Sequence, residues 1–223
     1  MAAGVLTLSS VAGQQSKPQD NFAQLTAHWN FDEGRDWHNM SFPFQSPVSQ
    51  AVDHAGKNNL ALNRQLDPVK AWASGRQFSG IRFDAPGQFL LAKSPINELK
   101  ETCSLSYWIK TAAEGSAEAK SAPSVIGDMQ GLVWGAIGQD GKLIIAEEGK
   151  TIAGSKDPVN DNQWHHVVLC RNAESGHVYI FIDGQRSGQG KPTPGQLKAD
   201  YQEFGMATGG PGFTAILDTI PVF

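Results

Sequence analysis

The chain has 223 residues, of which 40 % are hydrophobic, so it can bury the core of one large domain or of two small ones. Its formal net charge of −4 argues against nucleic acid as a partner, because no basic stretch is available to neutralise phosphates. No apolar run is long enough to cross a membrane. The 24 glycines and 12 prolines favour many short strands joined by turns.

The N-terminal segment, residues 1–22, begins with a short apolar run that ends in Ser-Val-Ala, as a secretion signal does, but it lacks a basic beginning. We therefore expect either the remnant of a signal peptide or a disordered tail. A signal would place the protein outside the cell or on its surface. Residues 23–223 show no internal repeat and are predicted to form one domain.

The first part of this domain alternates apolar and polar residues with the period of two that a half-buried strand requires. Leu25 to Phe31 is predicted as the opening strand, followed by a turn and a long loop at residues 35–52. A structureless loop of that length is unusual in a compact domain and often functional. Further strands are expected within 53–62, 75–84, 89–91 and 103–110, with one helical turn at 95–99.

The second part continues the pattern after a polar, low-complexity surface loop at residues 111–123. Strands are predicted at 124–127, 132–137, 142–147, 201–205 and 213–223. Strands at a spacing of roughly 8–12 residues are typical of sandwiches and barrels.

Residues 160–186 contain the clearest hairpin of the chain. Trp164 to Cys170 (WHHVVLC) suits a pleated surface, and Ala173 to Gly176 carries turn residues. His177 to Ile182 alternates as a second strand, and Asp183-Gly184 is a strong hairpin-turn dipeptide that leads into a further hairpin.

Several segments, in order, resemble laminin-G-like and pentraxin-like domains of the concanavalin A-like superfamily. The clearest is W-H-H-V-V followed by G-H-V-Y-I-F-I-D-G, within residues 160–184. The others are HWNFDEG (28–34), DHAGKNNLALN (53–63), the Trp72 segment to Asp84, SLSYWIKT (104–111) and GFTAILDTIPVF (212–223). The resemblance implies an all-β, antiparallel β-sandwich of the jelly-roll type. Thr219 stands where that family usually has a second aspartate, and Pro221 predicts that the closing strand is an edge or ends there.

Catalysis is the first function to weigh, because glycosidases occur on the same fold. Their carboxylates occupy a Glu-x-Asp-x-x-Glu motif or a close variant, which this sequence lacks. Glu147 and Glu148 are adjacent in a strand end and therefore face opposite sides. His165 and His166 have no nucleophile motif beside them and are interpreted as structural. We expect no catalytic residues.

Calcium is the one cofactor that the resemblance implies, because jelly rolls of this superfamily often bind it through loop oxygens. The candidate ligands are Asp32, Asp53, Asn58, Asn59 and Asp218, with Asp53 and Asp218 as the best pair. The alternative is that Asp32 and Asp53 merely organise Asx-turns. Thr219 removes one potential ligand from a site that needs about six to eight oxygens.

Sugar binding uses aromatic faces together with polar loop groups. Four tryptophans lie in strand motifs and are expected in the core: Trp29, Trp72, Trp108 and Trp164. The aromatic candidates for ligand contact are Trp37, Phe42, Phe44 and Trp134. Trp37, in the long loop, is the best platform, although loop aromatics more often cover the edge of a core.

The resemblance also bears on the two cysteines, Cys103 and Cys170. Pentraxin-like domains join the corresponding strands by a disulfide, although both cysteines here are offset from that pattern. A Cys103–Cys170 disulfide and a pair of buried thiols both remain open, and a disulfide needs Cα atoms within about 7 Å.

The function expected from these features is non-catalytic recognition of a glycan or glycoprotein outside the cell, by one module of a larger secreted or surface protein. The first alternative is an accessory domain of a glycoside hydrolase whose catalytic site lies in another domain. The second alternative is a structural spacer without a ligand.

Overall fold

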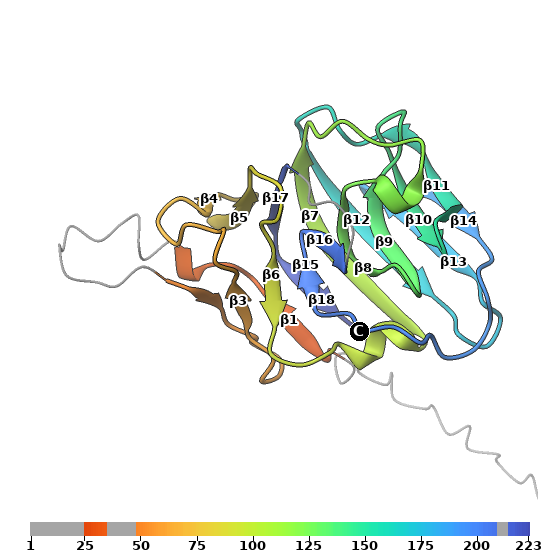
Figure 1. Cartoon of the computed structure of the whole chain (residues 1–223), viewed down its shortest axis with the longest axis horizontal. Helices are drawn as coiled ribbons and strands as arrows, with labels where there is room; N and C mark the ends of the chain where they lie inside the picture. The colour runs from red at the N-terminus through yellow and green to blue at the C-terminus, as the bar shows by residue number, and fades with distance from the viewer. Residues whose placement is uncertain (1–24, 35–47, 209–213) are drawn as a thin grey trace, which may run out of the picture.

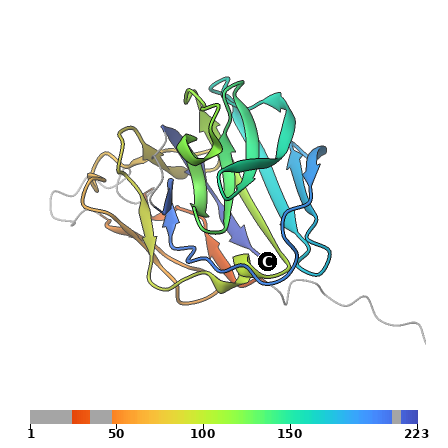
Figure 2. The same ribbon diagram turned by 45° about the vertical axis from the view of Figure 1, so that its right-hand side comes forward.

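The computed structural model describes residues 25–34, 48–208 and 214–223, which fold into a sandwich of two β-sheets (Figure 1). Strand pairs in these ranges are antiparallel, except that β16 (Met206–Thr208) runs parallel to β8 (Ser124–Asp128). The predicted all-β class and the antiparallel jelly-roll sandwich are confirmed. Figure 1 shows the two layers, with β8 and β9 of the second sheet in front of β12 of the first, and Figure 2 shows them turned by 45°.

The first sheet has the strand order β14-β13-β12-β7-β17-β5-β4, and β18 pairs with both β7 and β1. Its strands are β1 (Ala27–Trp29), β4 (Trp72–Ser74), β5 (Ser79–Phe83), β7 (Cys103–Thr111), β12 (Trp164–Arg171), β13 (Val178–Ile182), β14 (Gln185–Gly190), β17 (Ala215–Asp218) and β18 (Ile220–Val222).

The second sheet has the order β11-β10-β9-β8-β15-β6-β3-β2, with β16 beside β8. Its remaining strands are β2 (Gln50–Ala51), β3 (Leu60–Leu62), β6 (Leu90–Ala92), β9 (Leu132–Ile137), β10 (Lys142–Glu147), β11 (Lys150–Pro158) and β15 (Glu203–Phe204). Two short 3-10 helices, η2 (Asn97–Lys100) and η3 (Ala119–Ser121), lie in connections. Within the described ranges, no helix has the length and apolar character needed to span a membrane.

The core lies between the inner faces of the two sheets. On β7, Leu105, Tyr107 and Ile109 are fully buried, as the alternation of this strand predicts. Trp29 of β1 meets Phe204 of β15 edge-on, with ring centroids 5.4 Å apart, so this aromatic pair joins the two layers. Trp29 and Trp72 are both buried, as their strand motifs predict.

The outer face of the second sheet is covered by the segment predicted as a polar surface loop. Ala119 and Ala122, in and after η3, form a small buried cluster with outward side chains of β9 and β10, including Val133 and Ile144. Five alanines in residues 111–123 allow this close packing, so the prediction of a purely polar surface loop is only partly correct. The outer face of the first sheet carries no comparable buried cluster among the described residues.

Glycines close one side of the sandwich, where β11 and β14 meet at the edges of their sheets. A Cβ atom at Gly188 would collide with the carbonyl oxygen of Gly154, and one at Gly190 with that of Ile152. The Lys156 N–H donates to Ser187 Oγ at 2.9 Å across the same seam. Strand β11 was not predicted, because KTIAGSKDP lacks clear alternation.

His165, in the 160–186 hairpin, bridges two carboxylates. Its Nδ1 lies 2.8 Å from Asp183 Oδ2, and its Nε2 lies 3.1 Å from Asp161 Oδ1. Asp183, in the turn before β14, also accepts the His166 N–H at 2.8 Å. Burial alone would lower the pKa of His165, but the hydrogen bonds to both carboxylates outweigh it and raise that pKa. The histidine therefore ties the start of β12 to the Asp-Gly turn.

The closing strand corrects one expectation, because β18 is not an edge strand. Val222 pairs with Ala27 on one side and with Leu105 on the other. Thr219, at φ 47°, separates β17 from β18 and shifts the register against β7. Pro221 pairs with His28 close to this irregularity, where the ladder to β7 is interrupted, so the sheet tolerates its missing N–H.

Candidate functional site

The outer face of the first sheet carries a group of half-buried aromatic side chains. We call it the aromatic face, and it consists of Trp108, Trp164, His166, Tyr179 and Phe181. In register, Trp108 lies opposite His166 on the neighbouring strand. These residues lie across β7, β12 and β13, which are consecutive strands of the sheet.

The alternation of each strand directs these rings outward. Trp108 lies between the fully buried Tyr107 and Ile109, and Val168 lies between the fully buried Val167 and Leu169. Such outward positions are usually polar when a sheet face is solvated. A cluster of exposed apolar groups on a sheet face often marks a binding surface.

Neighbouring side chains hold the rings in place. Trp108 and His166 have ring centroids 4.9 Å apart, and His166 Nε2 lies 2.9 Å from Ser106 Oγ. The Arg76 guanidinium carbon lies 5.1 Å from the ring centroid of Trp108. At the other side of the face, the corresponding atom of Arg186 lies 4.8 Å from the centroid of Tyr179. Cation–π contacts of this kind order a surface before a ligand arrives.

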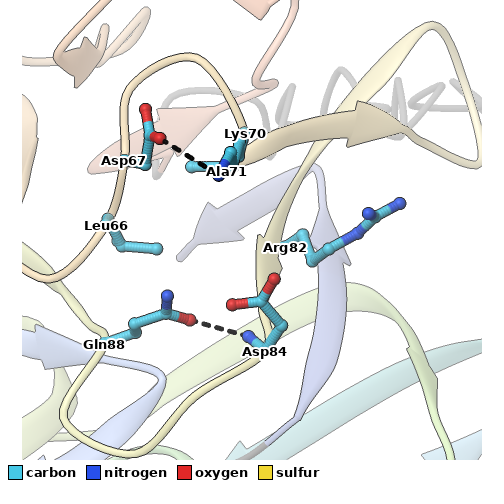
Figure 3. A pocket seen from close by; sticks show the side chains of 7 residues that line it. All are labelled: Leu66, Asp67, Lys70, Ala71, Arg82, Asp84 and Gln88. Atoms are coloured by element: carbon cyan, nitrogen blue, oxygen red, sulfur yellow. Dashed lines mark hydrogen bonds and ion pairs between the residues drawn. The ribbon is translucent and has the colours of Figure 1, made fainter.

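A polar cavity of about 250 Å³ opens at the β4–β5 side of the same sheet (Figure 3). We call it the edge pocket. It is lined by Leu66, Asp67, Lys70, Ala71, Arg82, Asp84 and Gln88. Leu66, Ala71 and Gln88 are buried and form the base, whereas the four charged side chains are exposed.

Hydrogen bonds to the backbone fix the walls of the edge pocket. Gln88 Oε1 accepts the N–H of Asp84 at 2.7 Å, and Gln88 Nε2 donates to the carbonyl oxygen of Gln65 at 3.2 Å. On the opposite wall, the Ala71 N–H donates to the Asp67 carbonyl at 2.8 Å. The Arg82 N–H donates to the Ala71 carbonyl at 2.7 Å and joins the two walls. The pocket is therefore built into the fold rather than formed by exposed side chains alone.

Strand register connects the edge pocket with the aromatic face. Arg82 of β5 lies opposite Ile216 of β17, which lies opposite Lys110 of β7, which lies opposite Trp164 of β12. These four residues form one row across the outer face of the sheet. Figure 3 shows the guanidinium of Arg82 extending away from Leu66 and Gln88.

The structure gives Asp53 a local role. Its Oδ1 accepts the N–H groups of His28, Ala55 and Gly56 at 2.9 to 3.0 Å, and its Oδ2 accepts that of Asn58 at 3.0 Å. Burial acts to raise the pKa of Asp53, but these four backbone donors together lower it. The carboxylate thus organises its own turn, which is the Asx-turn alternative considered above.

The other candidate calcium ligands also have protein partners. Asn59 Oδ1 accepts the Asp53 N–H at 3.0 Å, and Asp32 Oδ2 accepts from the side chain of Asn30 at 2.9 Å. Asp218 is fully buried, accepts the Gln77 N–H at 2.9 Å, and has a pKa raised mainly by burial. Among the described residues, no three His, Cys, Asp or Glu side chains are grouped as a metal site would require. Calcium binding stays a prediction.

The predicted aromatic candidates have two different outcomes. Trp37, Phe42 and Phe44 lie outside the described residues, so their role stays a prediction. Trp134 is fully buried inside β9 and is part of the core, so it presents no face to a ligand. The short apolar run of β9 gave no indication of which side the indole would take, since all six of its residues are buried.

The cysteines do not form the disulfide considered above, because both are free thiols. Cys103 lies opposite Arg171, and Cys170 lies opposite Ser104, in the same antiparallel pair. Cys103 shares the inward parity of Leu105, whereas Cys170 is half-buried on the outer face, 3.4 Å from Ser104 Oγ. The two sulfur atoms therefore point to opposite sides of the sheet. Burial raises the pKa of Cys103 to about 12.

Trp108 and Trp164 were expected in the core and lie instead on the outer face. Alternation in CSLSYWIK already contained the signal, because Cys103, Leu105, Tyr107 and Ile109 share one side and leave Trp108 on the other. The edge pocket had no such signal. Its walls come from residues 66–71 and 82–88, which only the fold brings together.

The chain belongs to the concanavalin A-like lectin/glucanases superfamily, because a laminin-G-type family model with that description matches residues 87–223. This match covers more than half of the sequence and includes the 160–186 hairpin. The resemblance inferred from the motifs is confirmed. No curated protein sequence matches this chain.

Solved structures share the fold at low sequence identity. Domain 4 of AbnA, a GH43 extracellular arabinanase from Geobacillus stearothermophilus, in complex with arabinotriose, has a TM-score of 0.55 and 17 % identity. That likeness covers 89 % of this chain and 91 % of the other. A Trypanosoma rangeli sialidase has a TM-score of 0.58 and 12 % identity over 99 % of this chain and 34 % of its own. This chain thus spans about a third of the sialidase's length.

Proposed function

We propose that this protein is a non-catalytic glycan-recognition domain that acts outside the cell and binds its ligand on the aromatic face. The single observation that supports this most strongly is the set of outward aromatic side chains on β7, β12 and β13. Aromatic faces and edges can pack against the C–H surfaces of sugar rings, while neighbouring polar groups bind hydroxyls. His166 and Lys110 supply such groups on the same surface, and the buried Ser106 holds the His166 ring.

Membership of the lectin/glucanase superfamily and the arabinotriose bound to domain 4 of AbnA favour a sugar ligand over another small molecule. Binding without catalysis is favoured because the carboxylates beside the aromatic face already have partners. Asp183 is bonded to His165 and to the His166 N–H, and Asp218 to the Gln77 N–H. Neither is placed to protonate a glycosidic oxygen on the open side of the sheet. Attachment to a larger secreted protein, either as an independent lectin or as an accessory domain of a hydrolase, belongs to the same proposal.

Isothermal titration calorimetry with oligosaccharides chosen from a glycan array tests this proposal. Phe181→Ala should weaken binding by roughly tenfold, or about 1.4 kcal/mol, if the ring contacts the sugar. Phe181→Leu keeps most of the apolar bulk and separates loss of the ring from loss of stability. Leu91→Ala, an exposed apolar position on the second sheet, serves as the matched control and should bind normally.

Three outcomes would contradict the proposal. The first is a blank glycan array, which favours a structural spacer. The second is release of reducing sugar by the isolated chain, which would show catalysis. Equal loss of affinity in Phe181→Ala and Leu91→Ala would move the binding surface elsewhere.

A further inference from the structure

Four cationic side chains lie on the outer face of the first sheet. Arg82 and Lys110 occupy outward positions of β5 and β7, since each lies between buried neighbours. Arg76 lies over Trp108, and Arg186 lies over Tyr179. None of the four has an ion-pair partner among the described residues. Their positive charges are therefore available to a ligand.

This arrangement contrasts with the chain as a whole, which has 18 Lys and Arg residues against 22 Asp and Glu residues. Most carboxylates that border the same face already have partners. Asp84 and Asp67 are exposed in the edge pocket, where Asp67 is paired with Lys70, and Asp32 is bonded to Asn30. Asp161 and Asp183 are both paired with His165. Asp218 is fully buried, so solvent and ligands do not reach its carboxylate. The unpaired charges of the outer face are thus mainly positive, although the chain as a whole is acidic.

The cations are spread along the sheet rather than gathered around one point. Arg82 is on β5 and Arg186 is on β14, with β17, β7, β12 and β13 between them. Five inter-strand spacings correspond to about 24 Å. Lys110 and Arg76 lie between these ends, next to Trp164 and Trp108. A linear ligand with repeated negative charges fits this spacing better than a single phosphate or carboxylate.

The aromatic rings favour one class of linear polyanion, acidic glycans, over the other, nucleic acids. Each ring of the aromatic face is half-buried, and two are overlaid by arginine, so none stands out far enough to stack between nucleic-acid bases. Flush rings instead suit the C–H surfaces of sugars. At the end of the row, Asp67 and Asp84 in the edge pocket can accept hydroxyl donors but would repel phosphates. The charges and rings together therefore favour a glycan.

We infer that the aromatic face binds an acidic glycan chain whose carboxylate or sulfate groups face Arg82, Lys110 and Arg186, with a hydroxyl-bearing end at the edge pocket. This inference rests on the proposed glycan-recognition function and names the ligand class of the same surface. It differs from neutral-glycan binding in one measurable respect, which is that charge on the ligand raises its affinity.

The test uses the full chain and four probes: an oligogalacturonate, its methyl ester, a heparin oligosaccharide and single-stranded DNA of similar length. The oligogalacturonate and its ester share one backbone and differ in charge, and heparin replaces carboxylate by sulfate. At least one acidic oligosaccharide should bind, and the ester should bind roughly tenfold more weakly than the oligogalacturonate if carboxylate is the recognised group. Binding should also weaken as salt rises from about 0.05 to 0.5 M.

Charge-removing variants locate the effect. Arg82→Gln/Lys110→Gln should weaken acidic-glycan binding by roughly tenfold. Lys93→Gln/Lys150→Gln removes the same charge from exposed positions near or on the second sheet and should change affinity by less than about twofold. The melting temperature of each variant, compared with that of the parent chain, separates lost binding from lost folding.

Three results would overturn the inference. Neutral glycans binding through Phe181 without any gain from charge would refute it while leaving the proposed function in place. Absence of binding by every glycan, neutral or acidic, would refute both. DNA binding more tightly than both acidic glycans would assign the positive face to nucleic acid instead.

Discussion

Arg171 offers a strong test of how the two ends of this sandwich are held together. The side chain is 2 % exposed, and its guanidinium donates to four backbone carbonyls, those of Lys100, Glu101, Thr193 and Gly195. It thereby joins β12 to the C-terminal end of η2 and to the long connection that follows β14. No carboxylate among the described residues forms an ion pair with it.

Arg171→Met would remove the charge, keep a similar apolar length and leave these carbonyls without their donor. Hydrogen bonds to a charged group contribute about 1.5–3 kcal/mol each, so four of them represent at least about 6 kcal/mol. Relief of the buried charge returns several kcal/mol. We therefore expect a net loss of about 3–5 kcal/mol, and a melting temperature lower by about 10 °C for a chain of this size.

Urea denaturation, followed by tryptophan fluorescence, measures this loss. Arg171→Lys keeps the charge but loses the fork of donors, so its stability should fall between those of the parent chain and Arg171→Met. Arg64→Met, at an exposed arginine, is the matched control and should change stability by less than about 0.5 kcal/mol. A loss of less than about 1 kcal/mol in Arg171→Met would refute the reasoning.

Three further predictions concern pH, the seam and the cysteines. The pKa of His165 is raised above its ordinary value of 6.5, so its stabilising contribution is complete below that pH and is lost as the pH rises through the higher folded-state pKa. His165→Gln should therefore make thermal stability between pH 6 and 9 less dependent on pH. An unchanged slope of stability against pH would count against the Asp161–His165–Asp183 bridge. Gly188→Val should lower the unfolding free energy by about 2 kcal/mol or more in urea, because its Cβ meets the Gly154 carbonyl. At Gly184, which unlike Gly188 has a positive φ, the Cβ would meet nothing within 4 Å, so Gly184→Val reports the backbone strain alone. A thiol reagent should label Cys170 in the native protein and both cysteines after denaturation; protection of both thiols until a reductant is added would show that the disulfide forms after all.

Much of the fold could be predicted because alternation and turn chemistry are local. Residues 103–110 and 160–186 carried both signals, and β7, β12 and β13 formed there. The missed strand β11 has few apolar residues, because it lies at the edge and pairs through its backbone. Local patterns do not predict such a strand, since it is stabilised by backbone hydrogen bonds to β10 and by contacts with β14 across the seam.

The candidate site was less predictable, because register decides it. Parity alone could place Trp108 outside, but the row from Arg82 to Trp164 exists only once β5, β17, β7 and β12 are aligned. The same limit applies to the cysteines, whose strands were correctly expected to be neighbours. A one-residue offset in that pairing placed Arg171, rather than Cys170, opposite Cys103.

Glycan binding by the aromatic face is tested most directly by an NMR titration of the isotopically labelled chain, 24.0 kDa in mass, with an oligosaccharide that binds. We predict that the amide signals that move will cluster on β7, β12 and β13, around His166, Tyr179 and Phe181. Signals of Leu91 and its neighbours on the second sheet should stay in place. Shifts confined to the second sheet, with those of β12 and β13 unchanged, would contradict the assignment of the aromatic face as the binding surface.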